Sequence, residues 1–342
     1  MVNDTKQRPL IIAEISGNHN GSLERALEIV RAAAKAGAHA IKIQTYTADT
    51  ITLDVDTPAF RVSDDHSLWG ARTLHSLYEE AHTPWEWHAP IFALAQELGM
   101  LAFSTPFDET AVEFLESLDV PMYKIASLEI VDLPLIEQVA STGKPVILSV
   151  GTASIAEVAQ AVEAARRGGC ADLTLLACTS SYPAEPDDAN LRRIPVMKEM
   201  FGVDVGLSDH TMGVGVSIAA VALGATVIEK HVTLRRADGG VDSAFSLEPE
   251  ELRLLVEGCD AAVRALGSAD VWATGAESES LRLRPSLYVA ADVKAGDAVT
   301  THNVRSVRPA GGLPPSDLPR VLERTFVRPA AKGTPVSWDL LR

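Results

Sequence analysis

Eight short apolar runs, each followed by a segment with helical periodicity, constrain the fold of this chain more than any other feature of its sequence. Each run has the length of a strand buried on both faces, and such strands are typical of parallel sheets. Eight strand–helix units in about 260 residues predict a closed (β/α)₈ TIM barrel rather than an open doubly wound sheet. The runs lie at residues 10–16, 40–46, 101–107, 122–127, 145–151, 173–180, 203–210 and 226–233.

The first unit illustrates the pattern on which this prediction rests. Its apolar run leads into a turn rich in Gly and Asn, after which Ser22 can cap a helix and Gly37 can end it. In a later unit, residues 83–88 are predicted to begin a capped helix. The other helical patterns lie at residues 85–98, 109–118, 133–141, 154–167, 190–200, 214–223 and 249–266.

The last part of the chain differs in character from the barrel. Residues 267–283 are small, polar and aperiodic, which is typical of a linker. Beyond them, short strands alternate with Gly/Pro turns, and the pattern of residues 291–299 recurs at 329–336. We therefore predict a barrel domain at 1–266, the linker, and a small, mostly β domain at 284–342.

The connection from residue 47 to residue 83 is too long for an ordinary loop between a barrel strand and its helix. Loops of this length are usually functional or partly folded. We interpret it as a lid or substrate loop, with a plain surface excursion as the equal alternative. It carries Arg61, Asp64, Asp65, Trp69 and Arg72.

Composition narrows the classes of partner. The formal net charge of −16 argues against nucleic acid, because phosphate backbones bind to basic surfaces. No apolar run approaches the roughly 20 residues that cross a bilayer, and residues 1–9 lack the apolar core of a signal peptide. The three cysteines show no metal-binding spacing and cannot all pair, which favours a reducing compartment. We expect a soluble, cytoplasmic protein without membrane or nucleic-acid partners.

Ionisable or hydroxyl-bearing residues end every predicted strand, where the active sites of this fold lie. Alternation places Lys42 and Gln44 on one strand face, and likewise Glu229 and His231. The strand-end set comprises Glu14, Lys42, Gln44, Ser104, Thr105, Phe107, Lys124, Ser127, Glu129, Ser149, Ser180, Tyr182, Ser208, Asp209, His210, Glu229 and His231.

Two lysines within apolar strands indicate an anionic ligand. A buried ammonium group is costly unless an anion meets it, so Lys42 and Lys124 are predicted to bind a phosphate or carboxylate. The alternative is that each lysine reaches the barrel rim or pairs with Glu14 or Glu129. The hydroxyl groups that could complete an anion site belong to Thr105, Ser127, Ser149 and Ser208.

His210 and His231 end neighbouring strands and are candidate ligands for a divalent metal. Two neutral imidazoles side by side suit such an ion. The alternative is that both are ordinary strand-end histidines, each held by one hydrogen bond. No Gly-x-Gly-x-x-Gly motif follows a strand, and there is no P-loop or Cys-x-x-Cys, so neither a nucleotide cofactor nor a structural zinc is predicted.

Taken together, these segments resemble the sialic acid synthase family. The resemblance covers residues 10–342, and the tail is similar to the antifreeze-like SAF domain of that family. The motifs that carry it are Ala13-Glu-Ile-Ser-Gly-Asn-His-Asn-Gly21, Lys42-Ile-Gln-Thr45, Ser104-Thr-Pro-Phe-Asp108, Tyr123-Lys-Ile-Ala-Ser127, Leu207-Ser-Asp-His-Thr211 and Glu229-Lys-His231.

The resemblance implies condensation of phosphoenolpyruvate with an N-acetylated amino sugar, giving a nine-carbon 2-keto acid and phosphate with the help of Mn²⁺ or Mg²⁺. It implies that His210 and His231 hold the metal, and that Arg308 reaches the partner subunit's site in a domain-swapped homodimer. The catalytic residues implied are Glu14, as the base, with Glu129, His210 and His231. Phosphoenolpyruvate would be held by Lys42, Thr105, Lys124, Ser127, Ser149 and Ser208, while Phe107, Glu129 and Tyr182 would face the sugar. Gln44 is a further substrate-binding candidate.

Within this family, residues 67–74, 83–88 and 239–249 look most like the branch that makes pseudaminic acid from 2,4-diacetamido-2,4,6-trideoxy-L-altrose. The branches that make N-acetylneuraminic or legionaminic acid are the alternatives. Ser180-Ser-Tyr-Pro183 lacks the Asn that sialic acid synthases proper tend to have before Tyr-Pro, which implies a different hydroxyl or acetamido pattern on the sugar. Arg284-Pro-Ser286 also departs from the family and predicts a stiffer hinge.

Two other hypotheses compete with this reading. One is an aldolase that uses free pyruvate through a Schiff base on Lys42 or Lys124. The other is a non-catalytic sugar- or ice-binding protein, in which the tail works and the barrel is a scaffold. Buried lysines at the strand ends count against a scaffold, because they cost stability without a ligand.

Overall fold

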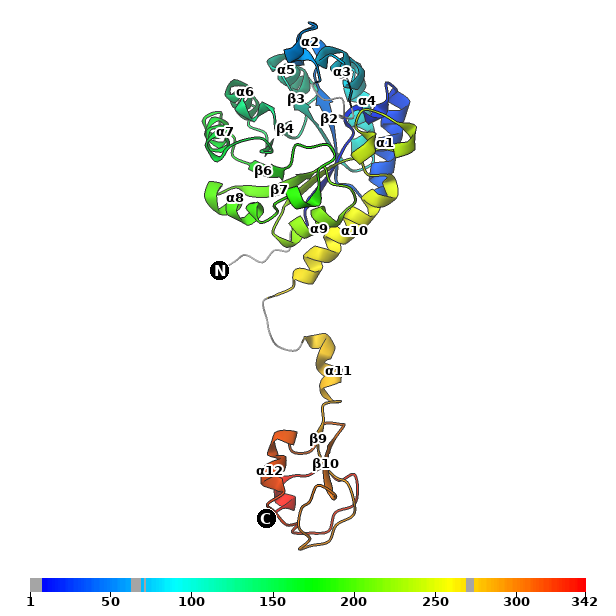
Figure 1. Cartoon of the computed structure of the whole chain (residues 1–342), viewed down its shortest axis with the longest axis vertical. Helices are drawn as coiled ribbons and strands as arrows, with labels where there is room; N and C mark the ends of the chain where they lie inside the picture. Colours follow the sequence, from blue (N-terminus) through cyan, green and yellow to red (C-terminus); the bar gives the residue numbers. More distant parts are fainter. Residues whose placement is uncertain (1–7, 63–68, 71, 269–273) are drawn as a thin grey trace. The chain divides into compact units, whose positions relative to one another are not determined.

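The computed structural model describes residues 8–62, 69–70, 72–268 and 274–342. The chain divides into two compact units, with the boundary between Gly267 and Ser268. Figure 1 follows the chain through both units, from the strands and helices of the first to the short strands of the second.

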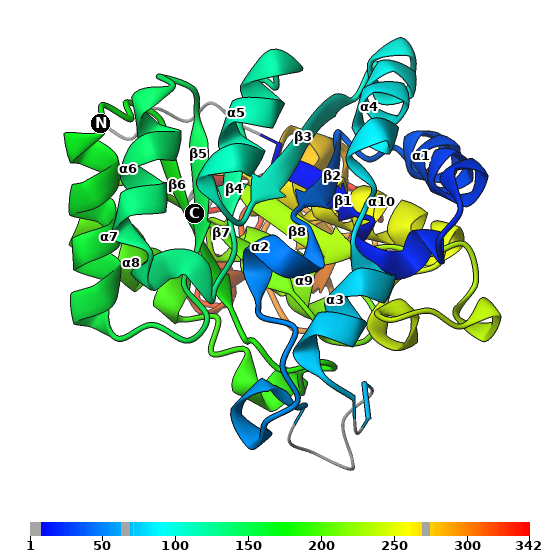
Figure 2. The same cartoon turned by 90° about the horizontal axis from the view of Figure 1, so that it is seen from above.

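The first unit is a (β/α)₈ TIM barrel, which confirms the prediction from the strand–helix alternation. The strands pair in parallel in chain order, and β8 closes on β1 in a register that runs from Leu10↔Val227 to Glu14↔His231. Figure 2 shows the helices arranged around these strands. Each strand ends one or two residues earlier than predicted, because its last predicted residues belong to the following loop. The bounds are β1 Leu10–Glu14, β2 Ala40–Thr45, β3 Leu101–Pro106, β4 Tyr123–Ile125, β5 Val146–Ser149, β6 Leu173–Cys178, β7 Asp204–Asp209 and β8 Val227–His231.

The outer helices begin and end largely where the sequence signals predict. Ser22 Oγ accepts a hydrogen bond from Arg25 N at 3.3 Å to cap α1, and Gly37 ends that helix with a φ of 91°. The capped start predicted at residues 83–88 was wrong: a 3₁₀ turn at Trp85–Trp87 precedes α4, which has no side-chain cap. The bounds are α1 Leu23–Ala36, α4 His88–Glu97, α5 Glu109–Ser117, α6 Leu133–Ser141, α7 Ile155–Arg167, α8 Arg193–Phe201, α9 Gly215–Ala222 and α10 Pro249–Leu266.

The long connection after β2 is partly folded. It contains the short helix α2 (Ala48–Ile51) and the helix α3 (Leu74–Ala81). Trp69 Nε1 donates to Val241 O at 2.9 Å, which ties the connection to the loop that follows β8. Asp64 and Asp65 lie outside the described residues.

The wall of the barrel packs closely where β6, β7 and β8 meet. A Cβ atom at Gly206 of β7 would lie 2.4 Å from Val227 O and 2.7 Å from Leu176 Cδ2. Only glycine fits such an approach, because real Cβ atoms do not come so near to backbone oxygen. This packing holds the ends of β7 and β8 side by side; His231 ends β8, and His210 directly follows β7.

The second unit is small and built from short strands and turns. Its antiparallel strands are β9 (Ser286–Val289) and β10 (Val304–Val307), and it also contains the short helices α11 (Ser278–Leu281) and α12 (Leu318–Val321). The recurring pattern at 291–299 and 329–336 makes the same bridge–turn–bridge twice, and Val293 of one copy pairs with Ala330 of the other. Part of the predicted linker is helical in α11, while residues 269–273 lie outside the described part.

Within the described residues, we find no helix that combines the length and the apolar character needed to cross a bilayer.

Candidate active site

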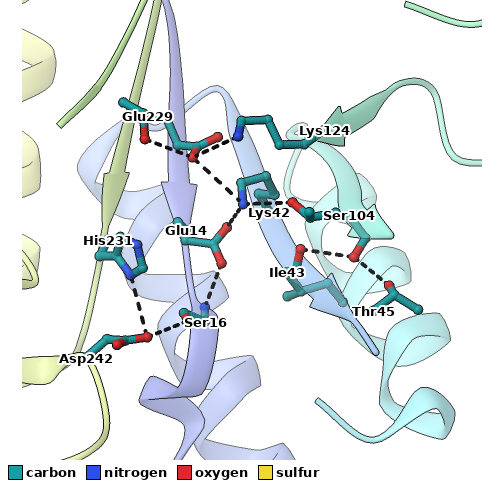
Figure 3. Close-up of polar contacts among 12 residues, drawn as sticks. Glu14, Ser16, Lys42, Ile43, Thr45, Ser104, Lys124, Glu229, His231 and Asp242 are labelled. Carbon is teal, nitrogen blue, oxygen red and sulfur yellow. Dashed lines mark hydrogen bonds and ion pairs between the residues drawn. The ribbon is translucent and has the colours of Figure 1, made fainter. Parts of the chain in front are cut away.

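Four charged side chains converge at the centre of the barrel, on β1, β2, β4 and β8 (Figure 3). Glu14, Lys42, Lys124 and Glu229 are each at most 5% exposed. Lys42 Nζ lies 2.5 Å from Glu14 Oε2 and 3.9 Å from Glu229 Oε1, and Lys124 Nζ lies 3.8 Å from Glu229 Oε1. The two ammonium groups thus face two carboxylates: Lys42 pairs with Glu14, and Lys124 faces Glu229 rather than Glu129.

Burial sets the protonation of this cluster. It raises the pKa of Glu14 to about 7, against the opposing effect of Lys42 and with a further contribution from Glu229. Burial alone would also raise the pKa of Glu229, but Lys124 and Lys42 outweigh it and lower that pKa. The pKa of Lys124 is lowered by burial. Glu14 is therefore the carboxyl group of the cluster whose pKa lies near neutral pH.

Two hydroxyl groups, those of Thr105 and Ser208, bond to members of this charged cluster. Thr105 Oγ1 accepts a hydrogen bond from Lys42 Nζ at 3.2 Å. The buried Ser149 Oγ has no hydrogen-bond partner among the described residues and is free to meet a ligand. Ser208 Oγ donates to Glu229 Oε1 at 3.3 Å.

Gly151, just beyond β5, leaves room for the hydroxyl groups beside it. Ser127 Oγ accepts a hydrogen bond from Gly151 N at 3.2 Å. A Cβ atom at Gly151 would lie 2.3 Å from Ser180 Oγ and 2.9 Å from Ser127 Oγ, and would displace both hydroxyl groups. Of the predicted anion-binding hydroxyls, that of Ser127 therefore lies where any larger residue at position 151 would displace it.

His210 and His231 lie side by side, with ring centroids 5.4 Å apart. His210 Nδ1 lies 3.0 Å from Thr179 O, so that this nitrogen carries a proton and Nε2 faces elsewhere. His231 Nδ1 is buried without a hydrogen-bond partner in the described part of the chain. Burial, followed by the charge of His210, holds the pKa of His231 well below its usual value, so its ring is neutral.

Cys178, at the end of β6, adjoins this histidine pair and was not among the predicted site residues. Its Sγ lies 3.9 Å from His210 Nδ1 and 3.7 Å from Ser180 Oγ. Although burial would raise the pKa of the thiol, its interactions with His210 lower it to about 7. The pKa of His210 is raised in turn, because Cys178 outweighs the effect of burial.

A divalent metal fits the chemistry of this histidine pair. His231 offers an orphaned nitrogen, and Asp242 Oδ2 lies 3.9 Å from its Nδ1. Among the described residues, no three or more His, Cys, Asp or Glu side chains lie together so that they could hold a metal ion. The chain itself would therefore supply two imidazoles and leave positions open for water or substrate, as catalytic metals require.

The loops that follow β1 and β8 are joined beside the site. Ser16 Oγ donates to Asp242 Oδ2 at 2.5 Å. Asn18 Nδ2 donates to Val232 O at 2.9 Å and to Ser246 Oγ at 2.8 Å, and both ends of these bonds are buried. The bond from Ser16 holds Asp242 in place beside His231 (Figure 3).

A cavity of about 500 Å³ opens beside this cluster. One side is aromatic: the Tyr182 ring lies 4.4 Å from the His210 ring and 5.5 Å from the Trp69 ring, measured between centroids. Glu129 lines the cavity with a buried Oε2 that has no partner among the described residues, and burial raises its pKa. Gln44 and Phe107 lie along the same wall. A ligand here would meet apolar rings together with unsatisfied polar atoms.

The structure brings the predicted site residues of the first unit to this end of the barrel. Arg308 belongs to the second unit. Sequence reasoning did not place Ser16, Cys178 or Asp242 in the site. Ser16 and Cys178 lie at or just beyond strand ends, and that position could have identified them from the sequence. Asp242 lies in an irregular loop, whose course cannot be predicted from hydrophobic periodicity.

Comparisons with known proteins agree with this geometry. The sequence matches the NeuB family over residues 29–271 and the SAF domain over residues 284–342. The pseudaminic acid synthase of Campylobacter jejuni is 44% identical over 312 residues, covering 91% of this chain and 90% of that protein. The N,N'-diacetyllegionaminic acid synthase of the same species is 34% identical over 315 residues, covering 90% of this chain and 92% of that protein. Among solved structures, the N-acetylneuraminic acid synthetase of Leptospira borgpetersenii, crystallised with citrate, has a TM-score of 0.70 at 33% identity and covers 81% of this chain and 91% of that one.

Proposed function

This chain belongs to the NeuB family and ends in a SAF domain, and on that premise we propose that it is a pseudaminic acid synthase. The reaction would join phosphoenolpyruvate to 2,4-diacetamido-2,4,6-trideoxy-L-altrose, giving pseudaminic acid and inorganic phosphate. The greater identity to a pseudaminic acid synthase than to a legionaminic acid synthase, 44% against 34%, supports this choice of sugar.

The observation that carries the proposal is the buried pair of lysines at the centre of the barrel. Lys42 and Lys124 are 3% and 2% exposed, and their nearest anionic partners are the carboxylates of Glu14 and Glu229. Phosphoenolpyruvate carries a carboxylate and a phosphate, so it can meet both ammonium groups at once. The hydroxyl groups of Thr105, Ser127, Ser149 and Ser208 would complete its binding.

The reaction makes one carbon–carbon bond and one carbon–oxygen bond to water, and it breaks the carbon–oxygen bond to phosphate. C3 of phosphoenolpyruvate attacks the aldehyde carbon of the open-chain sugar, and water adds at C2. The resulting tetrahedral intermediate loses phosphate. In our proposal Glu14 accepts the proton of the attacking water, because its carboxyl group lies beside Lys42 and has a pKa near 7.

His210 and His231 would hold a divalent ion, Mn²⁺ or Mg²⁺, beside the bound aldehyde. When bound, such an ion supplies Lewis-acid polarisation of the sugar carbonyl. His231 would contribute a neutral imidazole, and Asp242 lies close enough to its Nδ1 to orient a water or a sugar hydroxyl.

The aromatic cavity suits the proposed sugar. A 2,4,6-trideoxy sugar carries a methyl group at C6 and two acetyl methyl groups, which favour contact with rings such as Tyr182, Trp69 and Phe107. Its amide and hydroxyl groups would hydrogen-bond to the unpartnered Glu129 Oε2 and to Gln44. Phosphoenolpyruvate is an intermediate of central metabolism, so we place the reaction in the cytoplasm.

Phosphate release provides the direct test. With phosphoenolpyruvate and Mn²⁺, we expect turnover of the altrose, little or none of 2,4-diacetamido-2,4,6-trideoxy-D-mannose or N-acetylmannosamine, and at least a tenfold loss on adding a chelator (roughly the effect of removing a Lewis acid). Restoring Mn²⁺ should restore the rate, which excludes damage by the chelator.

Other outcomes of this assay contradict different parts of the proposal. Turnover of the mannose derivative would keep the reaction and reassign the sugar. Undiminished turnover after chelation would remove the metal role. Borohydride trapping of pyruvate on Lys124 would favour the aldolase, whereas phosphate release that requires both substrates would exclude it.

We also propose that the enzyme is a homodimer in which Arg308 of the second unit completes the site of the partner subunit. Arg308→Ala and Glu14→Gln proteins should each be nearly inactive. If the sites are shared, mixing and refolding them together should recover about a quarter of wild-type activity, because half the dimers are mixed and each holds one intact site. A mixture as inactive as its components would show that Arg308 does not act across subunits.

A further inference from the structure

Asp209 and Lys230 form an ion pair on the outer side of the barrel wall, next in the chain to His210 and His231. The two residues are partners in the β7–β8 register. Alternation turns their neighbours Ser208 and Glu229, which bond to each other, toward the barrel centre, so Asp209 and Lys230 face α9. Lys230 Nζ lies 2.9 Å from Asp209 Oδ2, and both side chains are 1% exposed.

Hydrogen bonds surround this pair. Asp209 Oδ1 accepts from Thr211 N at 2.9 Å and from Thr211 Oγ1 at 2.7 Å, while its Oδ2 accepts from Ser217 Oγ at 2.5 Å. Lys230 Nζ also donates to Thr211 O at 2.5 Å. Ser217 lies in the first turn of α9. The residues on either side of His210, the residue before His231 and the start of α9 are therefore tied to one another.

Stability alone does not account for the pair. Removing two charges from water is costly, and an apolar pair of similar size is often at least as stable. The neighbouring outward-facing residues, Leu207 and Ile228, are apolar and buried, as expected for a barrel wall. In the described part of the chain, the other ion pairs with both side chains under 10% exposed are those of Glu14, Lys42, Lys124 and Glu229 in the candidate active site.

We propose that the Asp209–Lys230 pair, with Thr211 and Ser217, is a positioning device that sets the spacing and orientation of His210 and His231 for a divalent metal. The inference rests on the metal role proposed above. The pair touches neither substrate nor metal; it acts through the backbone of the two strand ends. Without this ion pair, β7 and β8 still pair up to Ser208 and Glu229, but the distance between the two imidazoles is no longer fixed. Groups that orient metal ligands in this way typically change metal affinity by about 10–100-fold.

The test is Mn²⁺ binding to the full-length Asp209→Asn/Lys230→Met variant, followed by electron paramagnetic resonance. Asparagine keeps the acceptor for Thr211, and methionine fills the space of the lysine stem, so no charge is left buried and unpaired. We expect a metal-free melting temperature close to wild type and a Kd for Mn²⁺ raised about tenfold. At saturating Mn²⁺, kcat should return nearly to the wild-type value. A purely structural pair would instead lower the melting temperature and leave the Kd unchanged.

Two further variants complete the design. Ile228→Ala removes a buried, outward-facing side chain from the same strand, and should lower the melting temperature without changing the Kd. Ser217→Ala removes one hydrogen bond from Asp209 and keeps both charges, so it reports on the network even if the double variant does not fold; its Kd should rise by a smaller factor. An unchanged Kd in Ser217→Ala and in the folded double variant overturns the inference, and so does an equal rise in Ile228→Ala. If the wild-type protein itself binds no Mn²⁺, the metal role fails and this inference with it.

Discussion

Replacing Lys42 with methionine is expected to lower kcat/KM for phosphoenolpyruvate by about a hundred- to a thousandfold. Methionine keeps the length of the side chain but removes the ammonium group that lies 2.5 Å from Glu14 Oε2 and 3.2 Å from Thr105 Oγ1. The carboxylates of Glu14 and Glu229 then face Lys124 alone. Loss of Lys42 also raises the pKa of Glu14 further, and an anionic substrate would find one buried ammonium group in place of two.

The measurement is steady-state phosphate release at varied phosphoenolpyruvate, with circular dichroism to confirm folding. Lys198→Met is the matched control, because Lys198 is half exposed and pairs with Asp204 on the surface, 2.8 Å away. It should behave as wild type. If Lys42→Met kept both kcat and KM, Lys42 would have no part in binding the anion.

Replacing Glu14 with glutamine is expected to lower kcat/KM by about 10²–10⁴-fold and to remove the acid limb of its pH profile. In the wild-type enzyme the base must be ionised, and burial raises the pKa of Glu14 to about 7. The rate should therefore be full above this pH and fall about tenfold for each unit below it, as the carboxylate takes up a proton. Glutamine has the same shape but does not ionise, so the residual rate of the variant should not show that decrease at low pH.

Ionisation of phosphoenolpyruvate affects every variant alike, so the difference between profiles isolates Glu14. Glu163→Gln makes the same chemical change on α7, where the side chain is 76% exposed, and should retain the wild-type profile. An acid limb that persists unchanged in Glu14→Gln would assign the titration to another group.

The barrel was predictable because its signal is local and repeated eight times. Each apolar run fixed the strand that contains it, and a closed parallel barrel brings all carboxyl strand ends to one face. That rule is enough to group Lys42, Lys124, His210 and His231 from the sequence alone. The two copies of the turn pattern in the tail were visible for the same reason.

The contacts between side chains on opposite strands could not be predicted from the sequence, because they depend on the direction in which each side chain extends across the barrel. Lys124 could have met Glu129, five residues away in the chain, yet it faces Glu229 on β8. Asp242 reaches His231 by way of an irregular loop, held by Ser16. The start of α4 was misplaced because Thr83 is a good capping residue by type but lies before a 3₁₀ turn.

The closure of β8 on β1 has a consequence for how the enzyme comes into being during translation. Glu14 and Glu229 lie on adjoining strands but are among the first and the last barrel residues to leave the ribosome, and the loops that hold Asp242 join the same two regions. A nascent chain that stops short of β8 carries both lysines but lacks Glu229, His231 and the bonds across this joint. Such contacts between distant residues form late in folding. Truncated products would thus be inactive. Catalytic activity would appear in one step, when β8 pairs with β1.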